Sequence, residues 1–271
     1  MLVVRDTDHG ALEVCLLRRR KGSVFVPGMY VFPGGAVDPV DREPRWEEHV
    51  LGLDGATASR RLGIEAGGLA YWVAAVRETI EECGLLLAVR ADGTPLQLAA
   101  PEDRARLARY RVDLDGGSRD LFDICGDEGL LVDCRAMHYV AHWITPAGEP
   151  RRYDTRFFLA AAPDGQHAVH DGHEAVATRW VSAEQALEGN AAGQLAMLPP
   201  TVALLRWLAP YPTVAAALAA AAAIGEVPTI EPRIVGRAKD ARIVLPGEPG
   251  YDDATVDDAP VGDAPVEAGR G

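Results

Sequence analysis

The sequence of 271 residues contains no apolar run long enough to cross a membrane and no basic-then-apolar segment at its start. A membrane-spanning helix needs about 20 mainly apolar residues. The longest comparable run, residues 215–224, is shorter and mostly alanine. The opening residues MLVVRDTD lack the pattern of a secretory signal. We therefore expect a cytoplasmic protein with no membrane partner.

Positive charge and cysteine are scarce as well. The 27 lysines and arginines are outnumbered by 40 aspartates and glutamates, which gives a formal net charge of -13. Proteins that bind a nucleic-acid backbone neutralise its phosphates with basic side chains, so we expect no nucleic-acid partner. The cysteines show no C-x-x-C spacing, and neither a zinc site nor a disulfide framework is indicated. We expect reduced thiols at Cys15, Cys83, Cys125 and Cys134.

The N-terminal part of the chain has the pattern of short strands. Apolar and β-branched residues flank the polar tetrapeptide TDHG at 7–10, which indicates a hairpin. A further strand, MYV at 29–31, precedes FPGG at 32–35 and ends at the proline. Residues 39–68 are polar and contain glycines but no strong strand signal. There we expect an insertion with some helix.

From residue 69 the apolar spacing becomes helical, and Gly84 follows as a stop signal. The apolar positions are Leu69, Trp72, Val73, Val76, Ile80 and Cys83. Beyond this helix we expect strands at 85–89, 137–146, 151–162 and 174–182, and helices within 101–126 and at 182–189, 201–209 and 213–224. Ser182 followed by Gln185 is a helix-capping pattern. The mixture of strands and helices indicates an α/β protein.

The C-terminal residues differ in composition from the rest of the chain. From about residue 246 the sequence is rich in proline, glycine and aspartate. Such a segment cannot bury enough apolar surface to fold, and we expect an acidic, disordered tail. The sequence thus predicts one domain over 1–225, with insertions at about 39–68 and 100–135, and a C-terminal extension over 226–271.

The predicted helix ends in three glutamates, Glu78, Glu81 and Glu82, which share one face. Like charges at this spacing cost roughly 0.2–0.5 kcal/mol per pair, and each anion at a helix C-terminus costs about 0.3–1 kcal/mol. A divalent cation bound by carboxylate oxygens would offset this repulsion. The alternative is a solvated acidic face on which Arg77 pairs with Glu81 one turn later.

The neighbouring residues favour the metal. RETIEECG at 77–84, followed by Leu85, resembles the second half of the Nudix box, and FPGG at 32–35 resembles its glycine-led first half. The resemblance to the Nudix hydrolases implies an α/β/α sandwich around a mixed β-sheet, with helical insertions. It also implies Mg²⁺ or Mn²⁺ as cofactor and an arginine, Arg77, that orients the carboxylates. The implied metal ligands are Glu78, Glu81, Glu82 and Gly34.

The match departs from the box pattern in its first half. Gly35 and Arg77 are 42 positions apart, much further than in the usual box, and Leu69 stands where an early glutamate is usual. Asp38 and Glu65 are candidates to replace that acid. The long gap is itself a feature of a Nudix branch that includes an acyl-coenzyme A diphosphatase. The segments FVPGMYVFPGGAVDPVD, HWITP and RRYDTRFFLA resemble that branch as well.

Outside the box, a few side chains are candidates for catalysis and substrate binding. Glu174 precedes Trp180 on a loop where many Nudix enzymes carry a further metal ligand or general base; an ordinary surface acid and the nearby His170 and His173 are the alternatives. The expected catalytic residues are Arg77, Glu81, Glu82 and Glu174. Guanidinium groups bind phosphates in a bidentate manner. The expected substrate contacts are Arg18, Arg20, Gly35 and Arg156.

The function implied by the resemblance is metal-dependent hydrolysis of the diphosphate linkage in coenzyme A or acyl-coenzyme A. The products would be 3′,5′-ADP and a phosphopantetheine. One alternative is the same chemistry on ADP-ribose or another nucleoside diphosphate derivative. A second is a non-catalytic Nudix module that senses a nucleotide, and a third is a structural protein with an acidic surface helix. Homodimers are common in the family, and a homodimer is one assembly to test.

Overall fold

The computed structural model describes residues 1–20, 22, 27–96, 98, 100–149, 151–235 and 242–252. The chain forms two compact units. The first comprises Met1–Tyr139 and Phe158–Gly225, and the second comprises Val140–Phe157 and Glu226–Gly271. The glycine pair and the glutamates of the box-like segments both belong to the first unit, so the candidate site can be described within that unit alone.

The chain begins with the predicted hairpin. Strand β1 (Leu2–Asp6) pairs antiparallel with β2 (Leu12–Arg19). The amide of Gly10 donates a hydrogen bond of 2.8 Å to the carbonyl oxygen of Thr7 and closes the turn. Gly10 has a φ of 75°, which glycine adopts without strain. Most apolar side chains of both strands are buried, and burial of one register fixes the pairing.

A mixed sheet forms the centre of the first unit. Strand β8 (Asp154–Ala161) runs parallel to β1, with Leu159 opposite Leu2. Strands β3 (Tyr30–Val31) and β9 (Ala175–Val181) both pair antiparallel with β2. The strands expected in these regions are confirmed, and parallel and antiparallel pairing occur in one sheet.

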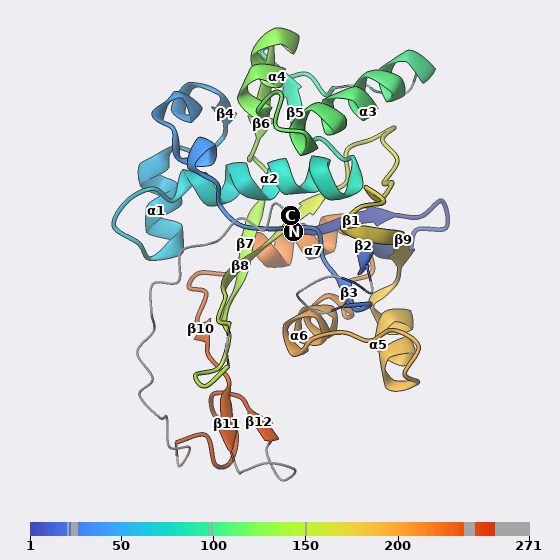
Figure 1. The fold of residues 1–271 in the computed structure, drawn as a ribbon. Helices are drawn as coiled ribbons and strands as arrows, with labels where there is room; N and C mark the ends of the chain where they lie inside the picture. Colours follow the sequence, from blue (N-terminus) through green and yellow to red (C-terminus); the bar gives the residue numbers. More distant parts are fainter. Residues whose placement is uncertain are drawn as a thin grey trace. The chain divides into compact units, whose positions relative to one another are not determined.

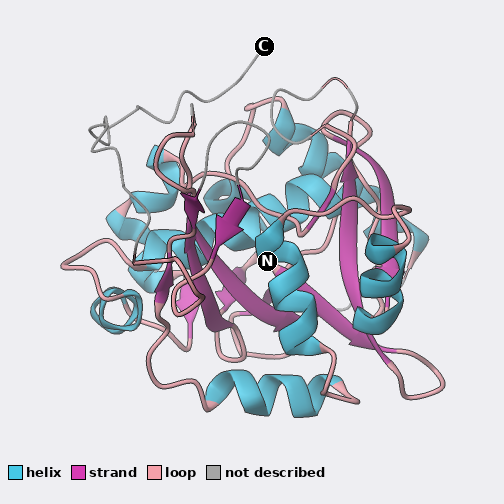
Figure 2. Ribbon diagram, turned by 90° about the horizontal axis from the view of Figure 1, so that it is seen from below, coloured by secondary structure: helices cyan, strands magenta, loops and turns pink. Residues whose placement is uncertain are grey.

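Helices cover both faces of this sheet. Helix α2 (Leu69–Cys83) lies on one side of the strands, and α5 (Ala183–Ala191), α6 (Pro199–Leu208) and α7 (Val214–Ala222) lie on the other (Figure 1). In a view turned by 90° the strands again lie between helices (Figure 2). The amide of Gln185 donates a hydrogen bond to the Ser182 hydroxyl and caps α5 as predicted. The predicted α/β/α arrangement is therefore confirmed.

The segment between the two halves of the box is folded into short helices and one short strand. It contains the 3₁₀ helices η1 (Pro39–Arg42) and η2 (Pro44–Glu48), strand β4 (Val50–Leu51) and helix α1 (Gly55–Leu62). Asp54 caps α1, since its carboxylate accepts a hydrogen bond of 2.7 Å from the amide of Thr57. The expectation of some helix in this segment is confirmed.

The residues after α2 form a small sheet and two further helices. Strand β6 (Leu130–Asp133) pairs with β4 and with β5 (Ala88–Arg90). Helices α3 (Pro101–Asp115) and α4 (Leu121–Glu128) lie between β5 and β6 in the chain. The strand expected at 85–89 was predicted to begin too early. The amide and carbonyl of Leu86 bond to the side chain of Gln166 and take no part in strand pairing.

The second unit is built on a hairpin. Strand β7 (His138–Ile144) enters it, the chain turns back at β8, and the amide of Thr145 donates to the carbonyl oxygen of Tyr153 at 2.9 Å. Strand β10 (Thr229–Ile230) runs parallel to β7, and β11 (Arg233–Val235) pairs antiparallel with β12 (Arg242–Val244). Sequence analysis did not predict β10, β11 and β12, which are two or three residues long.

Two expectations concern the whole chain. Residues 246–252 of the expected disordered tail are described and form a turn in which the amide of Tyr251 donates to the carbonyl oxygen of Glu248; the rest, 253–271, lies outside the described residues. Among the described residues, no helix is long and apolar enough to cross a membrane. All four cysteines are free and buried, as expected for reduced thiols.

Candidate active site

Helix α2 places the three glutamates at its C-terminal end. Its apolar stripe is buried against the core, from Leu69 through Trp72 and Ile80 to Cys83. The helix ends at Gly84, whose φ of 71° is left-handed. Glycine adopts this conformation without strain and commonly follows the last helical residue. Bounds and stop signal are both as the sequence predicts.

Arg77 lies at the centre of the acidic cluster, and its side chain is only 6% exposed. Nη1 donates to Oε1 of Glu78 at 2.8 Å and to Oε2 of Glu81 at 2.9 Å. Nε and Nη2 both bond to the carboxylate of Asp41 at 3.0 Å, and Nη2 also donates to the carbonyl oxygen of Ala36 at 2.8 Å. A guanidinium has five N–H groups, and each of them has an acceptor here.

Asp41 is the buried acid that sequence reasoning missed. It lies on η1, in the segment between the two halves of the box, and its residue is 2% exposed. Of the two acids proposed to replace the early glutamate, Asp38 lies 3.6 Å from Nη2 of Arg77, and Glu65 is exposed. The carboxylate of Asp41 also accepts a hydrogen bond of 2.8 Å from the Asp38 amide. The short helical signal PVDR was the available clue to its position.

The glycine pair packs directly against two of the glutamates. The amide of Gly34 donates a hydrogen bond of 2.8 Å to Oε2 of Glu82. A Cβ atom added at Gly35 would lie 2.5 Å from Cδ of Glu78, so a larger residue would displace that carboxylate. Gly34 has a φ of 149°, which few other residues tolerate. The structure therefore brings FPGG and the glutamates together, although 42 positions separate Gly35 and Arg77.

The guanidinium of Arg19 and the terminal amine of Met1 lie near Glu82, and burial lowers the pKa of the amine to about 6. Nη1 of Arg19 is 3.9 Å from Oε1 of Glu82, and Nη2 of Arg19 is 3.4 Å from Oε2 of Glu174. The terminal amine of Met1 donates a hydrogen bond of 2.5 Å to the carbonyl oxygen of Pro33. Arg19 thus links the glutamate of the box helix to the glutamate of the loop before β9.

The expected substrate contacts Arg18 and Arg20 lie on either side of this arginine in the chain. Arg20 is exposed, and its backbone amide donates to the carbonyl oxygen of Glu174; Arg18 is half-buried. The register of β2 against β9 shifts between Arg18 and Arg19. Sequence reasoning chose Arg18 and Arg20, whereas the ion pairs with the glutamates come from Arg19. The extra residue at this shift, Val176, lies on β9, so alternation along β2 continues and places Arg19 on the face opposite to that of Arg18. The sequence alone does not show which of the two faces meets the glutamates.

Arg156 belongs to the second unit. Its Nη1 pairs with Oδ1 of Asp154 at 2.9 Å, and its side chain is 7% exposed. Asp154 also pairs with Nε2 of His142 at 2.5 Å. A substrate contact by Arg156 stays a prediction, since these contacts lie within the second unit.

Burial shifts the protonation of the acidic cluster. It raises the pKa of Glu78 to about 7, with repulsion from Glu81 adding to the effect and Arg77 opposing it. Burial also raises the pKa of Glu81, and Arg77 opposes the shift. The pKa of Glu82 lies well above its ordinary value because of burial and the charge of Glu78, despite the hydrogen bond from Gly34. Burial therefore disfavours the charged form of all three carboxylates, despite their protein partners.

The donor set suits a hard divalent cation. The side chains that meet at the end of α2 offer carboxylate oxygens, which Mg²⁺ and Mn²⁺ prefer. Burial raises the pKa of Glu78 and of Glu82, and a bound cation would favour their charged form. Within the described residues, no three Asp, Glu, His or Cys side chains stand in a formed metal cluster, since Glu78 and Glu81 turn to Arg77 and Glu82 to Gly34. The residues fit the group: Glu78, Glu81 and Glu82 would hold it.

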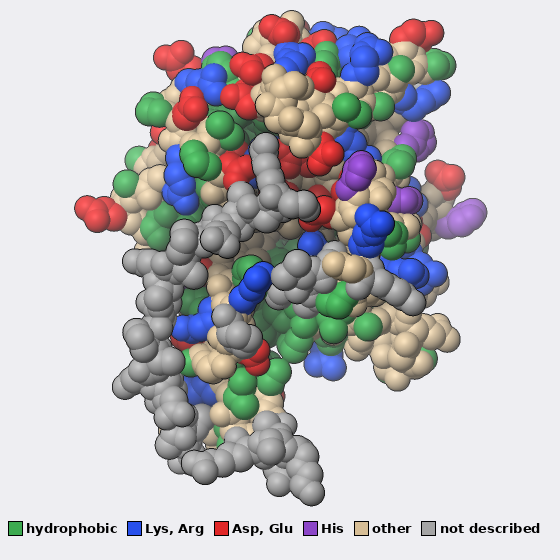
Figure 3. All heavy atoms as spheres, in the orientation of Figure 1, with side chains coloured by type: hydrophobic (Ala, Val, Ile, Leu, Met, Phe, Trp, Pro, Cys, Tyr) green, Lys and Arg blue, Asp and Glu red, His purple; other side chains and the backbone are tan. Residues whose placement is uncertain are grey.

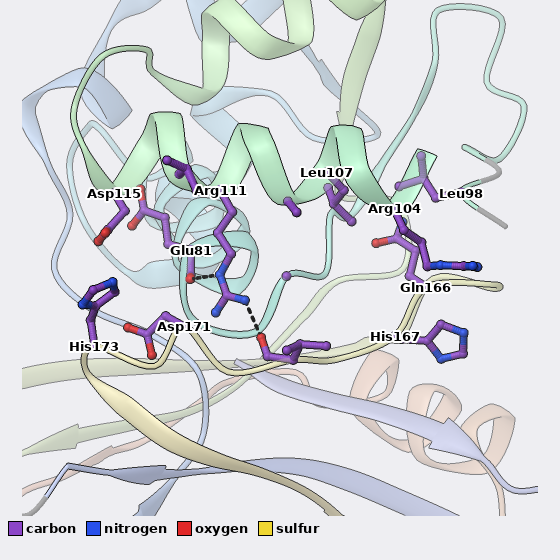
Figure 4. A pocket seen from close by; sticks show the side chains of 14 residues that line it. Glu81, Leu98, Arg104, Leu107, Arg111, Asp115, Gln166, His167, Asp171 and His173 are labelled. Carbon is purple, nitrogen blue, oxygen red and sulfur yellow. Dashed lines mark hydrogen bonds between the residues drawn. The ribbon is translucent and has the colours of Figure 1, made fainter. Parts of the chain in front are cut away.

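A cleft of about 370 Å³ opens beside the end of α2. Figure 4 shows α3 along one side of it and the loop before β9 along the other. Arg104, Gln166 and His167 lie toward one end, and Asp115, Asp171 and His173 lie toward the other. The remaining lining is mainly apolar: Leu98, Leu107, Ala108, Val112 and Val169. His173, which competes with Glu174 for the role of base, lines this cleft.

The space-filling view adds the distribution of charge. Acidic side chains gather near the centre of the face drawn in Figure 3, next to histidines. Over the described residues seen above them, acidic and basic side chains are interspersed. Such a mixed surface differs from the basic stripe with which proteins bind a nucleic-acid backbone.

The sheet, the box helix and the glycine pair together define a Nudix fold. The structure is similar to the crystal structure of a Nudix hydrolase from Alicyclobacillus acidocaldarius, with a TM-score of 0.62 and 29% identity over 80% of this chain and 92% of that one. The family model of the NUDT19 Nudix domain matches residues 56–208. The chain therefore belongs to the NUDT19 Nudix domain family.

Relatives of similar sequence are named as acyl-coenzyme A diphosphatases. The chain is 28% identical over 236 residues to the human "Acyl-coenzyme A diphosphatase NUDT19", covering 76% of this chain and 63% of that protein. It is 28% identical over 222 residues to the protein of the same name from Gallus gallus, with coverage of 69% and 58%. The chain spans less than two thirds of the length of these relatives, so the activity in their names is a proposal for this chain.

Proposed function

We propose that the protein is a metal-dependent hydrolase that cleaves the diphosphate linkage of coenzyme A or acyl-coenzyme A. The observation that carries the proposal is the packing of Gly34 and Gly35 against the Arg77-centred glutamate cluster. This arrangement supplies oxygen ligands and buried negative charge that a cation must balance. The substrate is taken from the relatives named acyl-coenzyme A diphosphatase, at 26–28% identity.

The residues of the site have different roles in the proposed hydrolysis. Glu78, Glu81 and Glu82 would hold the cation, with a carbonyl of Gly34 as a further ligand, and Arg77 holds Glu78 and Glu81 in place. The cation, when bound, supplies positive charge to the phosphoryl oxygens and acidifies water. Water attacks one phosphorus, the bridging P–O bond breaks, and the bridging oxygen leaves with the other phosphate.

A carboxylate must accept the proton of the attacking water. Glu82 is buried, whereas Glu174 is 60% exposed and is linked to it through Arg19. An exposed carboxylate can pass the proton on to solvent. Glu174 is the base we propose, and the products are 3′,5′-ADP and a phosphopantetheine.

The cleft beside α2 suits a substrate with a long apolar arm. It adjoins Glu81 and has leucine, alanine and valine on its walls. Ligand sites are typically concave and mainly apolar, with few polar groups. A pantetheine or acyl chain would match this lining better than a second nucleotide would. Substrate contacts by Arg18, Arg20, Gly35 and Arg156 remain part of the proposal, as do Mg²⁺ or Mn²⁺ as the metal, a cytoplasmic location and a homodimer.

The test is a panel of diphosphates incubated with Mg²⁺ or Mn²⁺ and read by mass. The panel contains coenzyme A, an acyl-coenzyme A, ADP-ribose and a dinucleotide. We expect 3′,5′-ADP from the first two, with a loss on the order of 10³-fold in Glu82→Gln. Glu184→Gln is the matched control, since Glu184 is exposed in the first turn of α5. Cleavage of ADP-ribose alone would show the same chemistry on a different substrate. Binding of a panel member without cleavage would indicate a non-catalytic nucleotide sensor.

A further inference from the structure

Backbone carbonyl oxygens at the end of helix α2 need hydrogen-bond donors from outside the helix, and the insertion supplies them. The last carbonyls of a helix have no partner within it. The carbonyl of Ile80 accepts from the amide of Gly84 at 2.9 Å, and the carbonyl of Cys83 accepts from the amide of Val169 at 2.8 Å. The carbonyls of Glu81 and Glu82 remain, and both belong to proposed metal ligands.

Arg111 on α3 satisfies both. Its Nε donates to the carbonyl oxygen of Glu81 at 2.7 Å, and its Nη2 donates to that of Glu82 at 2.7 Å. Its Nη1 donates to the carbonyl oxygen of Val169 at 2.6 Å; Figure 4 shows the contact of Arg111 with Glu81. A planar fork of donors can make these bonds at once, which a lysine cannot do.

The third contact reaches the loop that carries the proposed base. Val169 is bonded in both directions, through its amide to Cys83 and through its carbonyl to Arg111. Two residues later, the carboxylate of Asp171 accepts hydrogen bonds of 2.8 Å from the amides of Glu174 and Ala175. The loop position of Glu174 is therefore fixed at two points, and Arg111 holds one of them.

The positive charge of Arg111 also balances the partial negative charge at the C-terminal end of α2. The last turn of α2 contains no basic residue, although it carries acidic side chains. A cation near a helix C-terminus stabilises the partial negative charge of its carbonyls by about 0.3–1 kcal/mol. The insertion supplies that cation from a different helix, 29 positions away from Glu82.

We propose that Arg111 is a positioning residue for the diphosphatase site, which orients the backbone of Glu81 and Glu82 and ties it to the loop of Glu174. The inference rests on the proposed function in treating these glutamates as metal ligands. It gives the insertion over 100–135 a role in metal binding. Partners that orient ligands are typically worth 10–100-fold in metal affinity or activity.

A competing role for Arg111 is simply to attach α3 to the rest of the unit. Helix α3 buries only Leu107 and Leu114, so its attachment is modest. The two roles differ in what they affect. Loss of attachment lowers the stability of the protein, whereas loss of positioning changes the affinity for metal by more than the stability loss explains.

The experiment measures Mn²⁺ binding by the full chain from the electron paramagnetic resonance of free Mn²⁺. Arg111→Ala is expected to raise the Kd on the order of tenfold and Arg111→Lys to raise it less. Leu114→Ala controls for attachment, and we expect a lower Tm with a Kd within about twofold of wild type. Arg109→Ala controls for charge on the same helix, since Arg109 is exposed, and should leave both unchanged.

Turnover and hydrogen exchange complete the test. In Arg111→Ala we expect faster exchange at the amides of Gly84 and Leu85, with kcat falling more than KM changes. A Kd within twofold of wild type in Arg111→Ala, or an equal rise in Leu114→Ala, would overturn the proposal, and so would a wild type that binds no Mn²⁺. A wild type that binds Mn²⁺ but cleaves no panel member would overturn the proposed function, while the Kd of Arg111→Ala would still decide this inference.

Discussion

At the scale of single residues, Arg77 organises the acidic cluster. It bonds Glu78 and Glu81 on its own helix and Asp41 on η1. A buried ion that loses its partner is costly. Although burial lowers the pKa of Arg77, the hydrogen bond to Asp41 and the charges around it raise that pKa above its ordinary value. Asp41 is therefore the residue through which the first insertion acts on the site.

Replacing Asp41 by asparagine keeps its shape and removes its charge. We expect Asp41→Asn to lower kcat/KM for coenzyme A about tenfold and the free energy of unfolding by roughly 1–3 kcal/mol. Steady-state kinetics and urea unfolding measure the two effects. Asp38→Asn is the matched control, because Asp38 is 38% exposed and lies 3.6 Å from Arg77. Effects of the same size in both variants would contradict the role of Asp41.

At the scale of elements, the inserted helix α3 contacts the end of α2 and also lines the cleft. Arg111 reaches the end of α2, and Leu107, Ala108 and Val112 line the cleft beside it. Val112 is 70% exposed and is therefore accessible on this wall of the cleft. The helix thus combines a contact to the site with an apolar wall for a substrate arm.

A charge on that wall should discriminate between substrates. We expect Val112→Glu to lower kcat/KM for a long-chain acyl-coenzyme A about tenfold, since an acyl chain would then lie against a carboxylate that must stay solvated. The value for free coenzyme A should change less than about twofold. Kinetics with both substrates would decide, and Arg109→Glu on the same helix controls for added negative charge. An equal loss of kcat/KM for both substrates would contradict binding of the acyl chain in this cleft.

At the scale of the whole molecule, the glutamate cluster, the glycine pair, Glu174 and the cleft all belong to the first of two units. The net charge of -13 includes the buried carboxylates of this site. A ligand that binds only the folded protein stabilises it by mass action. Metal binding should therefore appear in the unfolding of the protein as well as in its chemistry.

Mn²⁺ at about one hundred times its Kd adds about 2.7 kcal/mol, which for a chain of this size raises Tm by roughly 5–10 °C. Burial raises the pKa of Glu78 from 4.5 to about 7. Its protonation stabilises the metal-free protein fully below pH 4.5, and this contribution is lost as pH rises through about 7. Metal competes with that proton.

The gain in Tm on adding Mn²⁺ should therefore be larger at about pH 8 than at about pH 5.5. Differential scanning calorimetry with Mn²⁺ and with a chelator measures it. Glu82→Gln should abolish most of the gain, and Glu184→Gln should keep it. A Tm that is the same with metal and with chelator would speak for a structural protein with an acidic helix and against both the enzyme and the sensor.

The sequence by itself determined the local elements and the chemistry of the box. The helix over 69–83, its stop at Gly84 and the hairpin from residue 2 follow from apolar spacing and turn residues, because these are properties of neighbours in the chain. The three glutamates on one face and the glycine pair could be recognised for the same reason. Roles carried by the resemblance, such as metal binding by Gly34, remain predictions.

Only the tertiary structure decided which distant residues complete the site. Asp41, Arg19 and Arg111 come from a 3₁₀ helix, a strand and an inserted helix, and nothing in their own neighbourhoods shows that they meet the end of α2. Strand β6 pairs with partners far along the chain, which local propensity does not encode. Burial by distant segments raises the pKa of Glu78. Spacing predicts which side chains share a face, whereas packing decides what meets that face and how far its charge is compensated.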